Sequence, residues 1–292
     1  MNKEFNKGLL LAGFGSFWWG FFGVLYFKYI TFIGYIELVI HRCLWTTLTL
    51  ILTTFFFSKW DIFFKIIKSK QNLIYLFISG FLIFINWGVW IYAIATNRII
   101  DASFGYFIMP ILSVLLGYIF FKEKLNNKRV FSIMLVILSI LYLIFVSLKS
   151  LPWVGIIVAL SWGFYNLVRK KINVDTDIGL LIESLFILPI AIIVFYMIAA
   201  KGYNDFSLSN PSMMLIIFLA GPMTVIPLFL YVRGVELCGL GPSGMIFYIT
   251  PTLQFLLGFF YYDEVFSFNK LVSFIIIWFA VIIYLRDLYE TN

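Results

Sequence analysis

Four ionisable residues stand within long apolar stretches of the sequence and are the first candidates for chemistry. Glu37, His41 and Arg42 share one stretch, and Glu183 lies in another. On a helix, residues four apart are neighbours, so the Glu37 carboxylate can pair with the His41 imidazole. Arg42 projects about 140° round the helix from Glu37 and must meet a different neighbour. If these stretches cross a membrane, charges there are costly and usually functional, which makes all four candidates for gating or proton coupling.

Each of these residues also has a structural interpretation. A glutamate near the membrane surface can hold a helix end through a hydrogen bond or ion pair, and we weigh this equally with gating for Glu37 and Glu183. Histidine titrates in a range that suits proton coupling. A single histidine beside an arginine is nevertheless more often structural, and we favour that interpretation for His41.

The composition decides where such residues lie. The chain has 292 residues, 63% hydrophobic and 12% charged, with a mean hydropathy of +1.02. A soluble domain is about half apolar and a quarter charged, so the excess apolar surface must face lipid. This excludes a cytosolic enzyme, a disordered chain and a secreted disulfide scaffold. The net charge of +7 is expected to mark the cytoplasmic side of the membrane rather than a nucleic-acid partner.

The apolar stretches predict an all-α polytopic membrane protein with ten transmembrane helices, at about 20 residues per span. The expected limits are 8–27, 34–57, 72–95, 102–121, 130–148, 151–168, 178–200, 212–231, 242–262 and 271–286. The first stretch is long enough to span and is expected to be a helix rather than a cleaved signal. Fifteen Lys and Arg residues fall on the side of the N-terminus and five on the other. We therefore expect a multi-pass membrane protein with both termini cytoplasmic.

An internal repeat organises these spans. Met109–Glu123 aligns with Thr250–Glu264 at an offset of 141 residues, with six of fifteen positions identical. Two shorter matches keep nearly this offset: Trp19–Phe21 with Trp162–Phe164, and Ile36–Glu37 with Ile182–Glu183. Because five spans is an odd number, the second copy must be inverted in the membrane. We expect two inverted five-helix repeats, 1–148 and 149–292, forming one membrane unit with a substrate site between them near the midplane.

Aromatic and polar side chains in mid-span are the candidates for that site. Asn86 and Gln254 need hydrogen-bond partners in hydrocarbon, and aromatic rings suit an amphipathic solute or an organic cation. Aromatic residues make up 21% of the chain, so most must simply pack or face lipid, and the matched tryptophans are favoured by symmetry. Prolines in span either kink a helix for packing or free a carbonyl for a ligand. The expected cavity residues are Trp19, Asn86, Trp90, Tyr106, Pro110, Trp162, Tyr165, Tyr248, Pro251 and Gln254, with Trp87, Tyr92 and Asn166 as further candidates.

Several segments together resemble a known family. They are GYIELVIHR (34–42), NWGVWIYA (86–93), ASFGYFIMP (102–110), LVRKKI (167–172), GLLIES (179–184) and YITPTLQFLLGFFYYDE (248–264). In this order they resemble the RarD-type proteins of the EamA group in the drug/metabolite transporter superfamily. The resemblance runs over nearly the whole chain and implies an inner-membrane transporter with ten helices in two inverted repeats. It favours export and leaves the substrate open.

The sequence thus predicts a secondary transporter, without a cofactor, that moves a small organic solute by alternating access through an aromatic-lined cavity. It contains no phosphate-binding GxxxxGK[ST] loop, so we do not expect direct drive by ATP. Expected partners are the solute, membrane lipid and a coupled proton, with no nucleic acid; the oligomeric state is left open. The alternatives are uptake of an amino acid or quaternary amine, a membrane enzyme acting on lipid-linked substrates, and a purely structural subunit.

Overall fold

The computed structural model describes residues 3–96, 99–147, 153–206, 211–261 and 268–291, and all regular structure in these ranges is helical. Arg98 and Lys149, two of the five basic residues counted on the side opposite the N-terminus, and Asp263–Glu264 at the end of the repeat match lie outside the described residues. The helices are α1 (Lys3–Trp18), η1 (Trp19–Gly23), α2 (Val24–Tyr29), α3 (Tyr35–Phe56), α4 (Trp60–Ile67), α5 (Lys70–Ala95), α6 (Ile99–Phe121), α7 (Asn127–Ser147), α8 (Trp153–Lys171), α9 (Thr176–Ala200), α10 (Pro211–Phe218), α11 (Ala220–Cys238), α12 (Leu240–Ile246), α13 (Ile249–Phe260) and α14 (Phe268–Thr291).

Many of these helices are long and apolar enough to cross a membrane. Among the described residues seven stretches meet this condition: Lys3–Tyr29, Tyr35–Phe56, Lys70–Ala93, Asn127–Val146, Thr176–Ala200, Pro211–Cys238 and Leu271–Thr291. Gly105–Phe121 is a shorter apolar helix. The chain is therefore an all-helical, multi-pass membrane protein, while the number of ten spans stays a prediction.

Three predicted spans are interrupted, and one helix was not predicted. The span expected over 212–231 divides at Leu219 into α10 and α11. The first span contains the π-helical turn η1, a type of insertion that is frequent at functional sites. The span expected over 242–262 divides into α12 and α13, and Pro251 lies in the first turn of α13, where its missing N–H costs nothing. The additional short helix α4 lies between α3 and α5.

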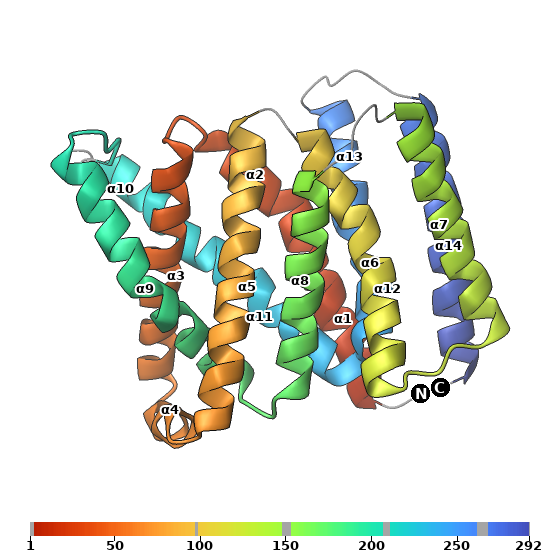
Figure 1. Ribbon diagram of the computed structural model, residues 1–292, viewed down its shortest axis with the longest axis horizontal. Helices are drawn as coiled ribbons and strands as arrows, with labels where there is room; N and C mark the ends of the chain where they lie inside the picture. Colours follow the sequence, from red (N-terminus) through yellow and green to blue (C-terminus); the bar gives the residue numbers. More distant parts are fainter. Residues whose placement is uncertain (1–2, 97–98, 148–152, 207–210, 262–267, 292) are drawn as a thin grey trace.

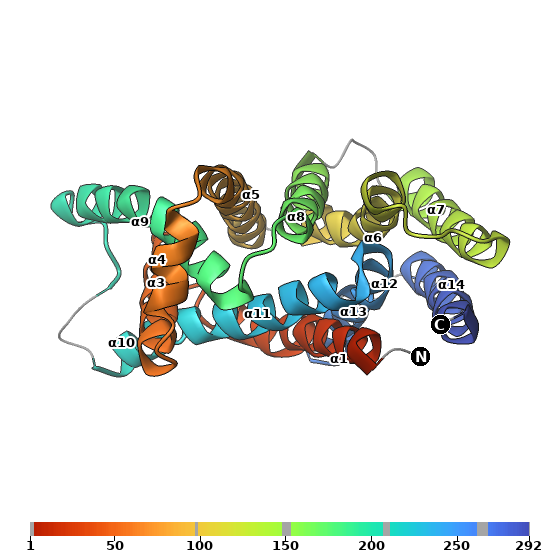
Figure 2. The same cartoon turned by 90° about the horizontal axis from the view of Figure 1, so that it is seen from below.

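The helices form two layers, which Figure 2 shows along the bundle axis. One layer contains α9, α5, α8, α6 and α7, and the other contains α3, α11, α1, α13 and α14. The most extensive contacts join α1 with α11, α6 and α5 with α8, α7 with α14, and α3 with α9. α1 begins and α14 ends at the same end of the bundle (Figure 1). We call this the termini end and the opposite one the far end.

Small residues allow α1 and α11 to approach closely. A Cβ on Gly234 of α11 would lie 2.7 Å from the Ala12 backbone nitrogen of α1, and one on Gly8 would lie 2.8 Å from the Cys238 nitrogen. In lipid, helices associate through such close backbone packing rather than through hydrophobic burial. Large apolar side chains, such as Phe14 and Phe145, are exposed on the outside of the bundle, as expected for a surface in contact with lipid.

Candidate functional site

A cavity lies between the two layers, in the half of the bundle nearer the far end. Its lining residues come from both halves of the chain: Trp19, Gly23, Phe27, Arg42, Asn86, Trp87, Trp90, Tyr106, Trp162, Phe247, Thr250 and Gln254. Its free volume is about 40 Å³, which is room for a few water molecules. A larger solute must therefore displace neighbouring side chains when it enters.

The tryptophans matched by the repeat meet in this cavity. The ring centroids of Trp19 and Trp162 are 5.0 Å apart in an edge-to-face arrangement. Phe247 packs 6.3 Å from Trp19 and 6.2 Å from Trp162, and Tyr231 lies 5.9 Å and 5.6 Å from the same two rings. Such pairs contribute beyond their buried area, so this aromatic cluster joins η1, α8, α11 and the α12–α13 segment at the centre of the bundle.

Arg42 brings a positive charge to the cavity wall. Its side chain is 4% exposed, and its Nε donates a hydrogen bond of 3.0 Å to Thr224 Oγ1 on α11. Its guanidinium carbon lies 4.5 Å from the Trp87 ring centroid, 4.8 Å from that of Phe27 and 5.9 Å from that of Trp90. Cation–π contacts of this kind stabilise a desolvated cation. Arg42, expected in gating or proton coupling, is among the residues that line the cavity.

The expected cavity residues divide into two sets. Trp19, Asn86, Trp90, Tyr106, Trp162 and Gln254 line the cavity, whereas Pro110, Tyr165, Tyr248 and Pro251 are not among its lining residues. Asn86 Nδ2 donates to the Val158 carbonyl and Ser161 Oγ, at 3.1 Å and 3.2 Å. Tyr248 donates to the Phe107 carbonyl at 2.9 Å.

The two expected cavity prolines pack differently from one another. Pro110 lies inside α6, where a Cβ on Gly244 of α12 would sit 3.2 Å from its carbonyl oxygen. Pro251 is buried in the first turn of α13. Both therefore shape helices next to the cavity without lining it.

Glu37 lies at the far end and is held by backbone donors. Its Oε2 accepts from the Asp205 N–H at 2.6 Å, and its Oε1 accepts from the Phe206 N–H at 2.9 Å. His41 Nε2 lies 3.3 Å from Oε1, which forms the pair expected from their spacing. The carboxylate thus ties the first turns of α3 to the segment after α9. A sequence cannot reveal this bond, because any residue supplies a backbone N–H.

Glu183 lies near the termini end and is held by side chains. It is 2% exposed, and its Oε1 accepts from Ser79 Oγ of α5 at 2.5 Å. Tyr165 Oη of α8 donates to Oε2 at 3.3 Å, and Arg169 Nη1 lies 3.5 Å from Oε1. Glu183 therefore connects α9 to α5 and α8, and the two matched glutamates lie at opposite ends of the bundle.

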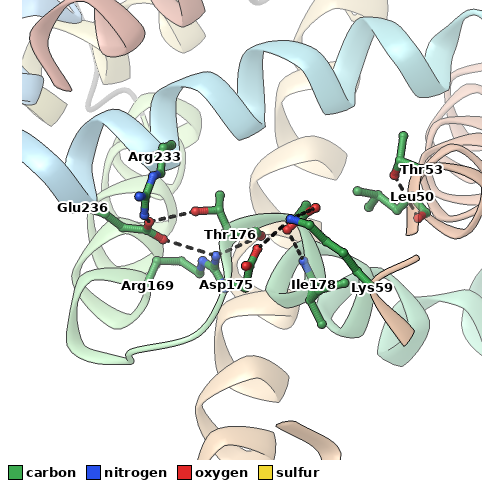
Figure 3. Close-up of polar contacts among 10 residues, drawn as sticks. Leu50, Thr53, Lys59, Arg169, Asp175, Thr176, Ile178, Arg233 and Glu236 are labelled. Carbon is green, nitrogen blue, oxygen red and sulfur yellow. Dashed lines mark hydrogen bonds and ion pairs between the residues drawn. The ribbon is translucent and has the colours of Figure 1, made fainter. Parts of the chain in front are cut away.

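A charged network surrounds Arg169 at the termini end (Figure 3). Arg169 Nη2 lies 3.7 Å from Glu236 Oε1. Glu236 Oε2 accepts from Thr176 Oγ1 at 2.7 Å and from Arg233 Nη1 at 2.8 Å. These contacts join the α8–α9 connection to the end of α11.

Lys59 forms further ion pairs at the termini end of the bundle. Its Nζ lies 2.8 Å from Asp177 Oδ2 and 3.3 Å from Asp175 Oδ1. Partial burial acts to lower the pKa of Lys59, but the hydrogen bond to Asp177 and the two negative charges outweigh it and hold the pKa above its ordinary value. Lys59 thereby links the connection after α3 to the start of α9.

Glu123 is a further contact at the termini end that was not among the predicted site residues. Its two carboxylate oxygens accept from the Leu240 and Gly241 N–H groups at 2.8 Å each, at the first turn of α12. Exposed N–H groups at a helix start favour a negative charge. The signal for it was present in the sequence, because Glu123 is the last identical residue of the internal repeat.

The fold and the site define a polytopic helical membrane protein with a cavity between its two halves. A profile of the "EamA-like transporter family" matches residues 6–145. The chain is 33% identical to "Uncharacterized transporter YojE" of Bacillus subtilis (strain 168), over 97% of this chain and 95% of that protein. It is 32% identical to "Protein RarD" of Escherichia coli (strain K12), over 99% and 97%. The chain belongs to the EamA family of membrane transporters.

Two more distant likenesses extend the comparison. "Chloramphenicol-sensitive protein RarD" of Pseudomonas aeruginosa is 23% identical over 85% of this chain and 83% of that protein. A protein of known crystal structure superposes with a TM-score of 0.71 at 13% identity, covering 96% of this chain and 97% of that one. The latter likeness shows a shared fold.

Proposed function

We propose that the protein is a secondary transporter of the bacterial inner membrane that moves a small organic solute by alternating access. The observation that carries this proposal is the cavity, because residues of both halves line it, with Trp19 and Tyr106 from the first and Trp162 and Gln254 from the second. A site between two repeats can be reached from either side when the repeats exchange conformations.

The packing supports two inverted five-helix repeats. Exchanging the halves replaces α1 by α8, α3 by α9, α5 by α11, α6 by α12–α13 and α7 by α14. This exchange converts one layer of Figure 2 into the other in the same order. It also converts the contact of α1 with α11 into that of α8 with α5, and the contact of α3 with α11 into that of α9 with α5. A pseudo-twofold relation between the halves accounts for both regularities.

Hydrogen bonds between α7 and α14 have the same symmetry. Ser139 Oγ donates to the Ser273 carbonyl at 2.9 Å, and Ser273 Oγ donates to the Ser139 carbonyl at 3.5 Å. A reciprocal pair of this kind is expected where equivalent helices cross on a twofold axis. The fifth helix of each repeat thus meets its counterpart.

Alternating access requires contacts at one end to separate while those at the other close. We assign the termini-end contacts of Lys59, Glu123 and Glu236 and the far-end contact of Glu37 to this role. With both termini cytoplasmic, the cavity lies toward the outside in this conformation, and a route to the cytoplasm requires the termini-end contacts to part. Glu37 and Glu183 are the proposed proton-coupling groups, His41 keeps its structural interpretation as the partner of Glu37, and export is the proposed direction.

Labelling of single cysteines tests the proposal. The two native cysteines, Cys43 and Cys238, are buried and would be replaced by serine. Gln254→Cys on the cavity wall should then react with a membrane-impermeant maleimide added to either side of oriented vesicles. Leu138→Cys, at a position 58% exposed on the outside of the bundle in the middle of α7, is the matched control and should react from neither side. Reaction of the Gln254→Cys variant from neither side would contradict the proposal.

A further inference from the structure

The described residues contain a charge in the cavity that has no counter-ion. Arg42 lines the cavity and is 4% exposed, and none of the lining residues is acidic. The ion pairs formed by buried side chains in the described ranges join Glu37 with His41, Arg129 with Asp287, and Arg169 with Glu183 and Glu236. No carboxylate of the described ranges lies within ion-pair distance of Arg42.

Glu37 is the nearest acidic residue in sequence and does not serve this purpose. Both of its carboxylate oxygens accept hydrogen bonds from the N–H groups of Asp205 and Phe206, and His41 Nε2 also lies 3.3 Å from Oε1. It also projects from a different side of α3 than Arg42 does. The positive charge of Arg42 is therefore offset within the cavity by aromatic ring faces and by the hydroxyl of Thr224.

From this arrangement we propose that the solute carries a carboxylate that binds Arg42, together with an apolar or aromatic part that packs against the tryptophans. This inference rests on the proposed transport function and adds the chemical class of the solute. A guanidinium offers its nitrogens in a planar fork that matches a carboxylate. Thr224 occupies Nε, and this bond fixes the plane in which the two Nη groups present themselves.

The same geometry argues against an organic cation as the solute. Ring faces could bind such a cation, but those of Phe27, Trp87 and Trp90 already contact Arg42. A second cation would face the guanidinium at short distance in a medium of low dielectric constant, where like charges repel strongly. The fixed charge therefore selects an anionic or zwitterionic solute over a cationic one.

Matched probes test the charge requirement. Purified protein in nanodiscs would be titrated with 3-phenylpropanoate, its amide and 3-phenylpropylamine, which share a ring and differ in charge, and with L-phenylalanine as a zwitterion. Thermal unfolding and quenching of tryptophan fluorescence report binding. We expect the carboxylates to bind and the amide and amine to bind at least tenfold more weakly. Preferential binding of the amine or the amide, or binding of no carboxylate, would overturn the proposal.

Variants locate the binding charge. Arg42→Gln should weaken carboxylate binding by about 10- to 100-fold, the usual effect of losing a charge-assisted, two-pronged hydrogen bond. Arg286→Gln is the matched control, because this arginine is 79% exposed on α14, and its variant should bind as the unaltered protein does. Thr224→Val keeps the charge and removes the orienting bond, so a several-fold weakening is expected even if Arg42→Gln fails to fold. Unchanged affinity in both cavity variants would overturn the assignment.

The labelling experiment with the Gln254→Cys variant separates this inference from the proposed function. If that cysteine reacts from both sides but carboxylates do not bind, alternating access stands and the assignment of the solute class falls. If it reacts from neither side, the transport proposal itself fails.

Discussion

Arg42 and Arg169 are both buried arginines in the helical bundle, and their surroundings differ. Arg169 faces two carboxylates, with Glu183 at 3.5 Å and Glu236 at 3.7 Å, and it also donates to the Thr176 carbonyl at 3.2 Å. Arg42 has aromatic rings and one hydroxyl. The carboxylates around Arg169 neutralise its charge within the protein. The charge of Arg42 has no such counter-ion and lies in a cavity, so it is available to a charged ligand.

The same contrast separates the two ends of the bundle. At the termini end, ion pairs join α8 to α11 (Figure 3) and α8 to α9. At the far end, Glu37 is held by backbone N–H groups. The ion pairs of Lys59 and Arg233 are partly exposed and can exchange partners with water, so these contacts suit the proposed opening of the termini end.

The largest expected effect is the loss of stability when the ion pair between Arg169 and Glu183 is removed. Arg169→Gln leaves the buried Glu183 carboxylate without its counter-ion, and this should lower the free energy of unfolding by about 3–5 kcal/mol. Arg42→Gln strands no carboxylate and removes ring contacts and one hydrogen bond, so it should cost about 1–2 kcal/mol. Thermal unfolding in one detergent would compare the two. Equal losses would contradict the distinction between the two arginines.

A smaller loss is expected when the space beside Arg169 is filled. Gly179 lies against the guanidinium so closely that an added Cβ would displace it. Gly179→Ala should therefore lower stability by about 1–3 kcal/mol, the usual effect of overpacking a buried site. Gly88→Ala is the control, since a Cβ there meets nothing within 4 Å. A Gly179→Ala variant as stable as the control would argue against a fixed position of Arg169.

The backbone contact of Glu37 at the far end should also contribute to stability. Glu37→Gln should lower the free energy of unfolding by about 1–3 kcal/mol, because an amide can replace only one of the two acceptor oxygens that hold Asp205 and Phe206. Amide hydrogen exchange should become faster at Asp205 and Phe206, whose N–H groups donate to Glu37. Exchange unchanged at both would show that the carboxylate does not hold this segment.

The smallest effect concerns Lys59. It is partly exposed, so Lys59→Ala should cost at most about 1 kcal/mol. The pKa of Lys59 is raised in the folded protein, so its contribution is present below the ordinary pKa of lysine and is lost as the pH rises through the folded value. The difference in melting temperature between the variant and the unaltered protein should therefore shrink at strongly alkaline pH. Lys65→Ala, at an exposed position, should show no such change.

The sequence was most informative where symmetry applied. The repeat singled out Trp19 and Trp162, which the structure brings into contact, and helical spacing alone paired Glu37 with His41. Helical spacing also predicted that Arg42 projects away from Glu37. It could not predict the partners of Arg42, because Thr224 and Trp87 come from distant parts of the chain. Contacts that depend on how helices cross cannot be derived from a local pattern.

The sequence was least informative where backbone groups or breaks in helices matter. The partners of Glu37 and Glu123 are N–H groups that any residue could supply. The sequence of 242–262 is one continuous apolar stretch, whereas the structure divides it into α12 and α13. Hydropathy does not distinguish a broken helix from a continuous one. Tyr248 and Pro251, which lie at and just after this break, were expected at the cavity from the repeat and are not among its lining residues.

One measurement tests the central claim, that the cavity opens alternately to the two ends, most directly. In the Gln254→Cys variant with Cys43 and Cys238 replaced by serine, a water-soluble carbodiimide would join Lys59 Nζ to the Asp177 carboxylate, 2.8 Å away, as an amide, and impermeant maleimide would then be added to each side; Lys59→Ala is the control that cannot be linked. Alternating access predicts that linking abolishes labelling of the cavity from the termini side and preserves it from the far side. Unchanged labelling from the termini side after linking would contradict it.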